Sequence, residues 1–356
     1  MAGKSKRPSA VRAKTARRHG PAAHATARGG APPRIGFLGL GMSVPAKVVT
    51  NFDLEKMVDT NDEWIRTRTG IRERRIAEPG TTTSDLAYPA SVEALKQAKL
   101  DPKDLELIIC ATTTPDMLFP STSCLVQQRL GAKKAVCFDL SAACSGSVFG
   151  IITAQQYLQT GRYKNALVIG AEVLSGFIDW TDRGTCVLFG DGAGACVMAP
   201  VDRGGILAAD MGSDGTAAEM LYMPGGGSKF PPSHSSVDQR LHFLRMNGTE
   251  VFKLAVRRMA DSAKRVLAQG RVKPEHVECF IPHQANTRII EAVAKWANLP
   301  IEKVFMNLER YGNTSAASNL IALYEAVKGG TVKKGDHVVL VAFGAGMTWG
   351  SILLEW

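Results

Sequence analysis

Three residues in this sequence could together perform acyl-transfer chemistry: Cys144, His283 and Asn313. Each follows an apolar, strand-like run or lies in a glycine-rich turn, and such positions meet at strand ends in α/β proteins. If the histidine deprotonates the cysteine and the asparagine orients the histidine, the three residues form a papain-like hydrolase site. If the cysteine carries an acyl group, the other two can donate hydrogen bonds to a developing enolate oxygen. Residue types and order leave both reactions open, beside a structural role for His283 and Asn313 in turns.

The segment around Cys144 has the pattern of a reactive thiol. The apolar run 135–140 predicts a buried strand, small residues at 141–146 predict a tight turn, and helical spacing then continues to Gly161. The thiol is therefore expected at a helix N-terminus, where N–H groups and the helix dipole favour negative charge and lower its pKa. The alternative is a buried, inert thiol, because cysteine is among the most buried residue types.

Two glycine-rich stretches are interpreted as turns and not as phosphate-binding loops. In the cluster of Gly36, Gly39 and Gly41, no third glycine and no helix follow at the places that a dinucleotide-binding loop requires. The sequence GDGAGA at 190–195 lacks the Lys-Ser/Thr of a P-loop and leads into a strand. The arginine-rich stretch 61–75 could hold phosphates beside an aromatic base, with a solvated charged surface as the alternative.

The elements that must position these residues recur in two halves of the chain. The strand-like run LELIICATTTPD has a counterpart in VECFIPHQAN, and ALVIG followed by GDGAGACVMA resembles HVVLVAFGAGMTWG. We therefore predict two copies of one strand–helix unit, at residues 35–205 and 206–356. Alternating buried strands and helices favour an α/β fold with parallel-rich sheets between helical layers.

Composition separates the N-terminal segment from the rest. Residues 1–34 hold nine of the 43 Lys and Arg residues and no Asp or Glu, which leaves 34 basic against 33 acidic residues in the remainder. We interpret this segment as a disordered basic tail, with a transit peptide and nucleic-acid binding as alternatives. The scattered seven cysteines indicate a reducing compartment, and no apolar run is long enough to span a membrane.

From about Ile35 to Trp356, the chain resembles the β-ketoacyl-acyl carrier protein synthase III family, the initiating condensing enzymes of fatty acid synthesis in the thiolase superfamily. The motifs that carry the resemblance occur in order: NDEWIRTRTGIRERR, AACSG around Cys144, DRGT, FGDGAGA, IPHQAN, YGNTSAAS and FGAGMTWG. The resemblance implies a duplicated thiolase-like fold with two mixed sheets between helical layers, in the order αβαβα. It also implies decarboxylative condensation of a short acyl-CoA with malonyl-acyl carrier protein.

The resemblance implies a role for each of the three central residues. Cys144 would take the acyl group as a thioester, and His283 and Asn313 would bind the malonyl thioester carbonyl, promote loss of CO2 and stabilise the enolate. Backbone N–H groups of Cys144 and Ala345 would form the oxyanion hole. The family usually has three glycines where this chain has Gly344-Ala345-Gly346.

The resemblance also implies how coenzyme A would bind. Trp64 and Arg183 would stack on the adenine, and Arg68 would meet the phosphates. Thr249 and Ala285 would contact the pantetheine, although related enzymes often have asparagine at the position of Thr249.

The implied macromolecular partners are an acidic acyl carrier protein and a second copy of the chain. Phe119 would reach across a homodimer to limit the partner's acyl pocket. A solvated polar face is the alternative for the side chains expected to hold the carrier protein, which are Lys253, Arg257, Arg258, Gln284, Arg288 and Lys295. No metal, redox cofactor, nucleic acid or membrane is implied, and a cytoplasmic location is expected.

Other functions predict different features. A biosynthetic thiolase needs a second cysteine near the C-terminal glycine turn, and the last cysteine here is Cys279 within a strand-like run. A Cys-His-Asn hydrolase would release free acid steadily from acyl-CoA. A nucleic-acid-binding protein would bind in a salt-sensitive way without residues 1–34. A polyketide-priming relative would use the same chemistry as the synthase.

Overall fold

The first of two main sheets contains five strands, in the order β1-β7-β6-β4-β5. The computed structural model describes residues 32–356. Strand β7 runs antiparallel to both of its neighbours, and β4 runs parallel to β5 and β6. The strands are β1 (Ile35–Ser43), β4 (Leu107–Ala111), β5 (Val136–Leu140), β6 (Ala166–Glu172) and β7 (Gly192–Pro200). The proposed tail at 1–34 falls, up to residue 31, outside the described residues.

The second sheet contains four strands in the order β11-β12-β13-β8. Strands β11 and β12 are parallel, whereas β13 is antiparallel to β12 and β8. The strands are β8 (Gly205–Ser213), β11 (Cys279–Pro282), β12 (His337–Gly344) and β13 (Thr348–Glu355). Both sheets are mixed. All strands of the first sheet precede residue 201, and all strands of the second sheet follow residue 204.

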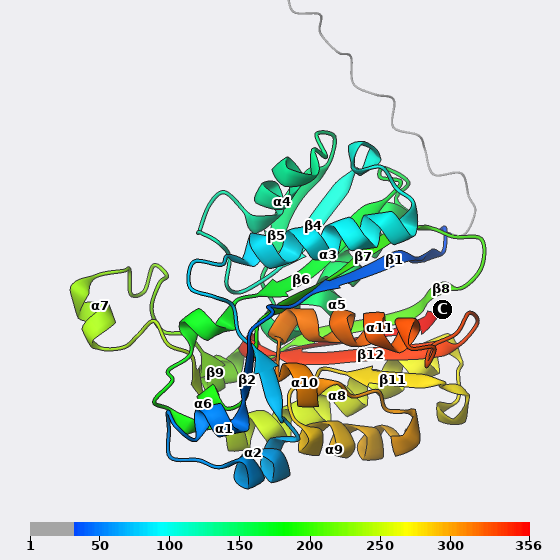
Figure 1. Cartoon of the computed structure of the whole chain (residues 1–356). Coiled ribbons are helices and arrows are strands. Elements are labelled where there is room, and N and C mark those ends of the chain that lie inside the picture. The colour runs from blue at the N-terminus through cyan, green and yellow to red at the C-terminus, as the bar shows by residue number, and fades with distance from the viewer. Residues whose placement is uncertain (1–31) are drawn as a thin grey trace, which may run out of the picture. The chain divides into compact units, whose positions relative to one another are not determined.

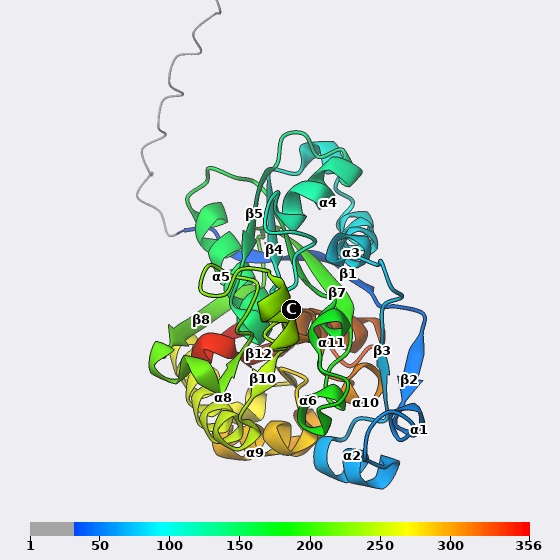
Figure 2. The ribbon, with the colours of Figure 1, turned by 90° about the vertical axis from the view of Figure 1, so that its left-hand side faces the viewer.

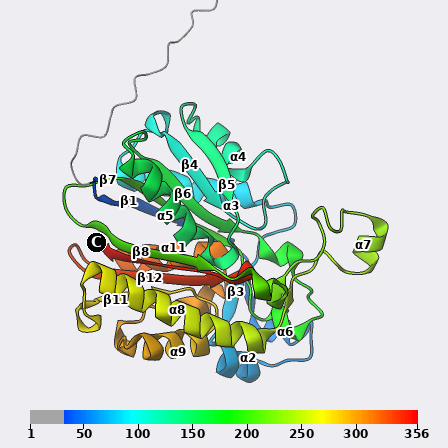
Figure 3. The ribbon, with the colours of Figure 1, turned by 180° about the vertical axis from the view of Figure 1, so that it is seen from behind.

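Helices form three layers around the two sheets (Figure 1). Helices α3 (Thr83–Ala98) and α4 (Thr122–Leu130) cover the outer face of the first sheet. Helices α5 (Gly146–Gln159) and α11 (Ser318–Lys328) lie between the sheets and contact both. Helix α8 (Gly248–Gly270) covers the second sheet, and α9 (Thr287–Ala297) packs on α8 (Figure 3).

This arrangement confirms the predicted α/β fold class of two mixed sheets between helical layers (αβαβα). Residues 32–356 pack as one compact unit, and a domain boundary between residues 205 and 206 stays a prediction. The central helices are apolar on most faces because each is covered by a sheet on two sides. Val148, Ile151 and Leu158 of α5 and Leu320 and Leu323 of α11 are accordingly all buried.

Shorter elements surround the strand ends. Figure 2 shows β2 and β3 along one side of the molecule, with α1 and α2 below them. These elements are α1 (Asn51–Leu54), α2 (Asp62–Thr69), α6 (Arg183–Cys186), α7 (His234–Asp238), α10 (Leu308–Tyr311), β2 (Val48–Thr50), β3 (Glu73–Arg75), β9 (Leu221–Tyr222) and β10 (Arg245–Met246). The expected long connection at 212–244 therefore contains short ordered elements.

One expectation about burial is wrong. The run before Cys144 forms strand β5 as predicted, but β5 is the edge strand of its sheet and pairs with β4 alone among the described strands. Val136 is consequently 48% exposed. An apolar run predicts a strand without revealing whether it lies at the centre or the edge of a sheet.

Glycine allows the two halves to approach each other closely at Gly170 of β6. A Cβ atom at this position would collide with the carbonyl oxygen of Ala316, in the turn that opens α11. Gly344 is similar, because a Cβ there would lie 2.7 Å from the amide nitrogen of Cys144. Both contacts bring backbone of one half against the turn of the other half.

We predict that Gly170→Ala destabilises the protein by about 1–3 kcal/mol, because the added methyl group has no space and the backbone must move. The matched control is Gly176→Ala, whose added Cβ would meet no atom within 4 Å. Chemical denaturation of both variants measures the difference. Equal stability of the two variants would show that the approach at residue 170 is not tightly constrained.

Candidate active site

Cys144 lies in a strained turn at the start of helix α5. A single turn of 3-10 helix, Ala143–Ser145, connects β5 to the helix, and Ala143 has a left-handed backbone with φ of 47°. Such conformations are costly for non-glycine residues and persist where surrounding structure holds them. The Ser145 hydroxyl donates to the carbonyl of Ala142 over 2.8 Å and contacts the Thr348 hydroxyl at 2.7 Å. The predicted strand–turn–helix around the cysteine is therefore confirmed.

The expected acidity of the thiol is contradicted. Cys144 is only 6% exposed, and burial raises the pKa of its thiol to about 12. A hydrogen bond from the Ser315 side chain lowers this pKa, and the negative charge of Glu172 raises it, but burial dominates. The resting cysteine is therefore a neutral thiol, and its proton must leave during any attack on a substrate.

His283 follows β11 and is held by two hydrogen bonds. Its backbone N–H donates to the carbonyl of Val341 over 2.7 Å, and its Nδ1 lies 2.6 Å from the hydroxyl of Ser318. The ring is 3% exposed, and burial lowers the pKa of the imidazole to about 3. The imidazole is therefore neutral near pH 7, and Nε2 is the nitrogen left to act on a bound molecule.

Asn313 is fixed through its backbone and its side-chain oxygen. Its N–H donates to the carbonyl of Leu188 over 2.8 Å, and its own carbonyl accepts from the N–H of Gly190 at 3.1 Å. Its side-chain Oδ1 accepts from the N–H of Ser315 at 2.8 Å. Because the oxygen is taken up, the amide NH2 group is the part that can donate to a ligand.

The structure brings the three predicted residues together. Cys144, His283 and Asn313 line one cavity of about 580 Å³. Five further residues predicted to bind coenzyme A or a carrier protein line the same cavity: Arg68, Thr249, Lys253, Ala285 and Arg288. A thiol, a neutral imidazole and an amide donor thus converge from three segments that are far apart in sequence.

A second, smaller cavity of about 210 Å³ also reaches Cys144. Its lining includes Ala345, which follows the close contact of Gly344 with the Cys144 amide. Most of the other lining side chains are apolar, and sequence reasoning did not identify them: Leu174, Phe177, Phe189, Leu221, Met223 and Leu244. The thiol therefore lies between a large open cavity and a small, mainly apolar one.

Two arginines lie against the ring of Trp64. The guanidinium carbons of Arg68 and Arg183 each lie 5.0 Å from the centroid of the Trp64 ring. Arg183 also donates to the carbonyl of Asp59 over 3.0 Å. The structure therefore brings together all three residues predicted to contact the nucleotide part of coenzyme A.

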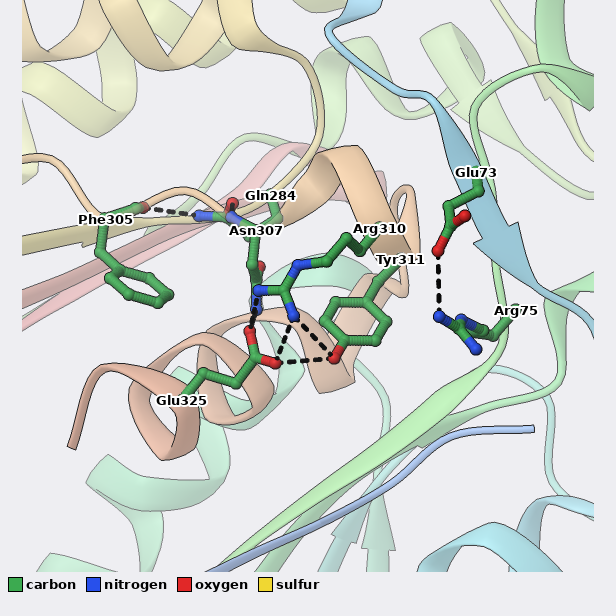
Figure 4. Close-up of polar contacts among 8 residues, drawn as sticks. All are labelled: Glu73, Arg75, Gln284, Phe305, Asn307, Arg310, Tyr311 and Glu325. Carbon is green, nitrogen blue, oxygen red and sulfur yellow. Dashed lines mark hydrogen bonds and ion pairs between the residues drawn. The ribbon is translucent and has the colours of Figure 1, made fainter. Parts of the chain in front are cut away.

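Gln284 is placed where it cannot contact a carrier protein, which contradicts that prediction. It is 1% exposed, its Nε2 donates to the carbonyls of Pro282 and Phe305, and its Oε1 accepts from the N–H of Asn307. Figure 4 shows the hydrogen bond between Gln284 and Phe305. Beside it lies a polar cluster on Glu325, which accepts hydrogen bonds from Asn307, Arg310 and Tyr311. Gln284 thus anchors the segment that leads to the Asn313 turn.

The other residues predicted to contact partners lie at the surface to different degrees. Arg258 is engaged within the protein, because it pairs with Asp214 at 3.2 Å and lies 4.6 Å over the ring of Trp349. Arg257 and Lys295 are exposed on α8 and α9. Phe119 is 83% exposed in the loop before α4.

Three polar residues close to the site were not predicted. Ser318 holds His283, Ser315 holds the Asn313 side chain, and Glu172 is a fully buried carboxylate that accepts from Ser315. Both serines belong to the motif YGNTSAAS, and Glu172 is the one charged residue in the apolar run 166–172. A charge at the end of a buried strand was the available signal for Glu172.

The fold and the cavity define a thiolase-like acyl-transfer enzyme with a cysteine at its centre. Family models described as 3-oxoacyl-[acyl-carrier-protein] synthase III match residues 138–215, and as its C-terminal part match residues 267–356. The β-ketoacyl-[acyl-carrier-protein] synthase III of Caldanaerobacter subterraneus is 57% identical over 322 residues, which cover 90% of this chain and 97% of that protein. The chain belongs to the 3-oxoacyl-[acyl-carrier-protein] synthase III family.

Solved structures agree with this assignment. The crystal structure of 3-oxoacyl-[acyl-carrier-protein] synthase III from Aquifex aeolicus matches with a TM-score of 0.85 and 50% identity, over 90% of this chain and all of that chain. The priming β-ketosynthase of the R1128 polyketide pathway matches with a TM-score of 0.84 and 35% identity, over 91% of this chain and 97% of that chain.

Within residues 32–356, no group of three or more His, Cys, Asp or Glu side chains is arranged to hold a metal ion. In the same residues, no helix is long and apolar enough to cross a membrane.

We predict that alkylation of Cys144 by iodoacetamide speeds up about tenfold per pH unit from pH 7 to pH 10, because thiolate forms in that proportion below a pKa of about 12. Peptide mass mapping separates Cys144 from the half-exposed Cys124 and Cys137. A rate that levels off below pH 8 would instead indicate a thiol made acidic by the helix N-terminus.

Proposed function

We propose that this protein catalyses the decarboxylative condensation of a short acyl-CoA with malonyl-acyl carrier protein, which initiates fatty acid synthesis. The observation that carries the proposal is the shared cavity of Cys144, His283 and Asn313. Family membership supports the reaction class, because relatives that are 54% and 57% identical to this chain are named as β-ketoacyl-[acyl-carrier-protein] synthases III.

In the first half-reaction, the sulfur of Cys144 attacks the acyl-CoA carbonyl and coenzyme A leaves as the thiol. Backbone N–H groups of Cys144 and Ala345 stabilise the tetrahedral oxyanion. The acyl chain then occupies the small apolar cavity, whose volume of about 210 Å³ suits a short chain. Trp64, Arg68 and Arg183 hold the nucleotide, and Thr249 and Ala285 line the route of the pantetheine.

In the second half-reaction, malonyl thioester enters the emptied large cavity. The Nε2–H of neutral His283 and the NH2 group of Asn313 donate to its thioester carbonyl, so CO2 leaves and the negative charge gathers on the enolate oxygen. The enolate carbon attacks the acyl thioester, the carbon–sulfur bond to Cys144 breaks, and the released sulfur takes up a proton from solvent to become a thiol again. Burial keeps the imidazole uncharged near pH 7, so it acts as a neutral hydrogen-bond donor.

The partners follow from the same reaction. Lys253 and Arg288 line the large cavity, and Arg257 and Lys295 are exposed nearby on α8 and α9, so an acidic carrier protein would dock over these helices. A homodimer would cover the exposed Phe119, which would then limit the acyl pocket of the partner. The reaction needs no metal or redox cofactor, and the free state of all seven cysteines supports a reducing, cytoplasmic location.

A polyketide-priming enzyme is the second candidate function. It is favoured by the 35% identity to the priming β-ketosynthase of the R1128 pathway, which has the same fold. The chemistry is identical, so the identity of the carrier protein distinguishes the two functions.

We predict that incubation with acyl-CoA alone adds one acyl mass to the intact chain, and that Cys144→Ser abolishes this addition. Intact-protein mass spectrometry measures it, with Cys124→Ser as a control that keeps the acyl group because residue 124 lies outside both cavities. Steady release of free acid without a stable adduct would favour a hydrolase. An adduct that persists in Cys144→Ser would move the nucleophile elsewhere.

We predict that His283→Ala still becomes acylated but loses malonyl decarboxylation by about 100-fold or more, because one of two enolate donors is gone. Release of labelled CO2 from malonyl-acyl carrier protein measures the second half-reaction separately from the first. Loss of self-acylation with retained decarboxylation would make His283 a base for the cysteine.

A further inference from the structure

Glu172 is a fully buried carboxylate at the end of β6 that the reaction described above does not use. It accepts hydrogen bonds from the backbone N–H groups of Thr113 and Thr114, and from the hydroxyls of Thr112, Thr113 and Thr114. Together with Ser315, these threonines are its hydrogen-bond partners within residues 32–356, and none of them carries a positive charge. Burying a carboxylate without a cation costs free energy. Its position beside a reactive cysteine therefore indicates a functional role for Glu172.

Ser315 connects this carboxylate to the nucleophile. Its hydroxyl donates to Glu172 Oε1 over 3.1 Å, and Ser315 lines the same small cavity as Cys144, whose pKa its side chain lowers. The residue has a left-handed backbone with φ of 47°, and its N–H is tied to Asn313 Oδ1. The strained turn therefore fixes this hydroxyl beside the carboxylate and in the wall of the cavity that the thiol also lines.

The thiol needs a proton acceptor, because it is neutral in the resting site. His283 is poorly suited, since Nδ1 already contacts the Ser318 hydroxyl at 2.6 Å and burial strongly disfavours the charged ring. Burial acts in the opposite sense on Glu172, whose pKa it raises and whose carboxylate it makes a better base. Ser315 gives this carboxylate its connection to the sulfur.

We propose that Glu172 accepts the proton of Cys144 through the hydroxyl of Ser315 during self-acylation. The inference rests on the proposed function, because it concerns the first half-reaction. The S–H bond breaks as the sulfur–acyl bond forms, the thiol proton passes to Ser315 Oγ, and the hydroxyl proton passes to Glu172. When the carbon–sulfur bond to coenzyme A breaks, the proton returns by the same route and coenzyme A leaves as the thiol.

The groups around Glu172 determine whether Glu172→Gln makes the Cys144 thiol more or less acidic. The negative charge of Glu172 acts on the thiols of Cys144 and Cys110, and the charges of Asp139 and Asp116 act on Cys110 as well. The negative charge of Glu172 raises the pKa of Cys144, so its removal makes the thiol more acidic. Glu172→Gln therefore helps thiolate formation in general and removes the specific proton acceptor for attack on a thioester.

We expect Glu172→Gln to slow self-acylation from acyl-CoA by about 100-fold at pH 7, the scale of a lost general base. Its rate should then rise with pH in parallel with thiolate formation, whereas the wild-type rate changes less. Alkylation of Cys144 by iodoacetamide, which needs only thiolate, should be unchanged or faster. Rapid-quench mass spectrometry measures both reactions across pH 6–10.

Two further variants keep the test decisive if the glutamine disturbs folding. Ser315→Ala removes the connecting hydroxyl and should reproduce the slow self-acylation. Thr112→Val removes a different contact to the carboxylate, at 3.3 Å, and should acylate at the wild-type rate. Wild-type protein that forms no acyl adduct would contradict the proposed function itself. Variants that acylate like wild type, or that lose acylation and alkylation equally, would overturn the relay alone.

Discussion

The site depends on the close packing of two buried helix N-termini, those of α5 and α11, between the sheets. Each helix begins with a strained turn, at Ala143 and at Ser315, whose backbones have the same left-handed φ of 47°. Gly170 and Gly344 allow backbone from one half to lie directly against the turn of the other. This contact brings a thiol, an imidazole and an amide from three distant segments into one cavity. The duplicated fold thus contains two similar turns. Cys144 lies in one of them, and Ser315 opens the other directly after Asn313 and Thr314.

Burial sets the protonation states of the groups in this cavity. It raises the pKa of the Cys144 thiol to about 12 and lowers that of the His283 imidazole to about 3, so both are neutral near pH 7. A neutral histidine is suited to donate a hydrogen bond to an enolate, and a neutral thiol keeps the resting enzyme from reacting unselectively. The same burial raises the pKa of Glu172, which makes this carboxylate a stronger base.

Much of the fold and the central site could be predicted from the sequence, because both depend on local pattern. Apolar strand-like runs, glycine turns and helical spacing located the elements around Cys144, His283 and Asn313. Tertiary burial was not accessible in the same way. The sequence indicated the helix N-terminus at Cys144 but not how deeply the thiol is buried. This burial raises the thiol pKa, whereas the helix N-terminus alone would lower it. Gln284 lies beside His283 in the chain yet points into the protein, and an apolar run at residue 136 lies at a sheet edge.

One cavity couples acyl transfer to decarboxylation in this protein. The most direct measurement follows CO2, free coenzyme A and the 3-oxoacyl product together when acyl-CoA and malonyl-acyl carrier protein are supplied to the intact protein. If the two half-reactions share this cavity, each product molecule forms with release of one CO2 and one coenzyme A. Release of coenzyme A and free carboxylic acid without CO2 would contradict it.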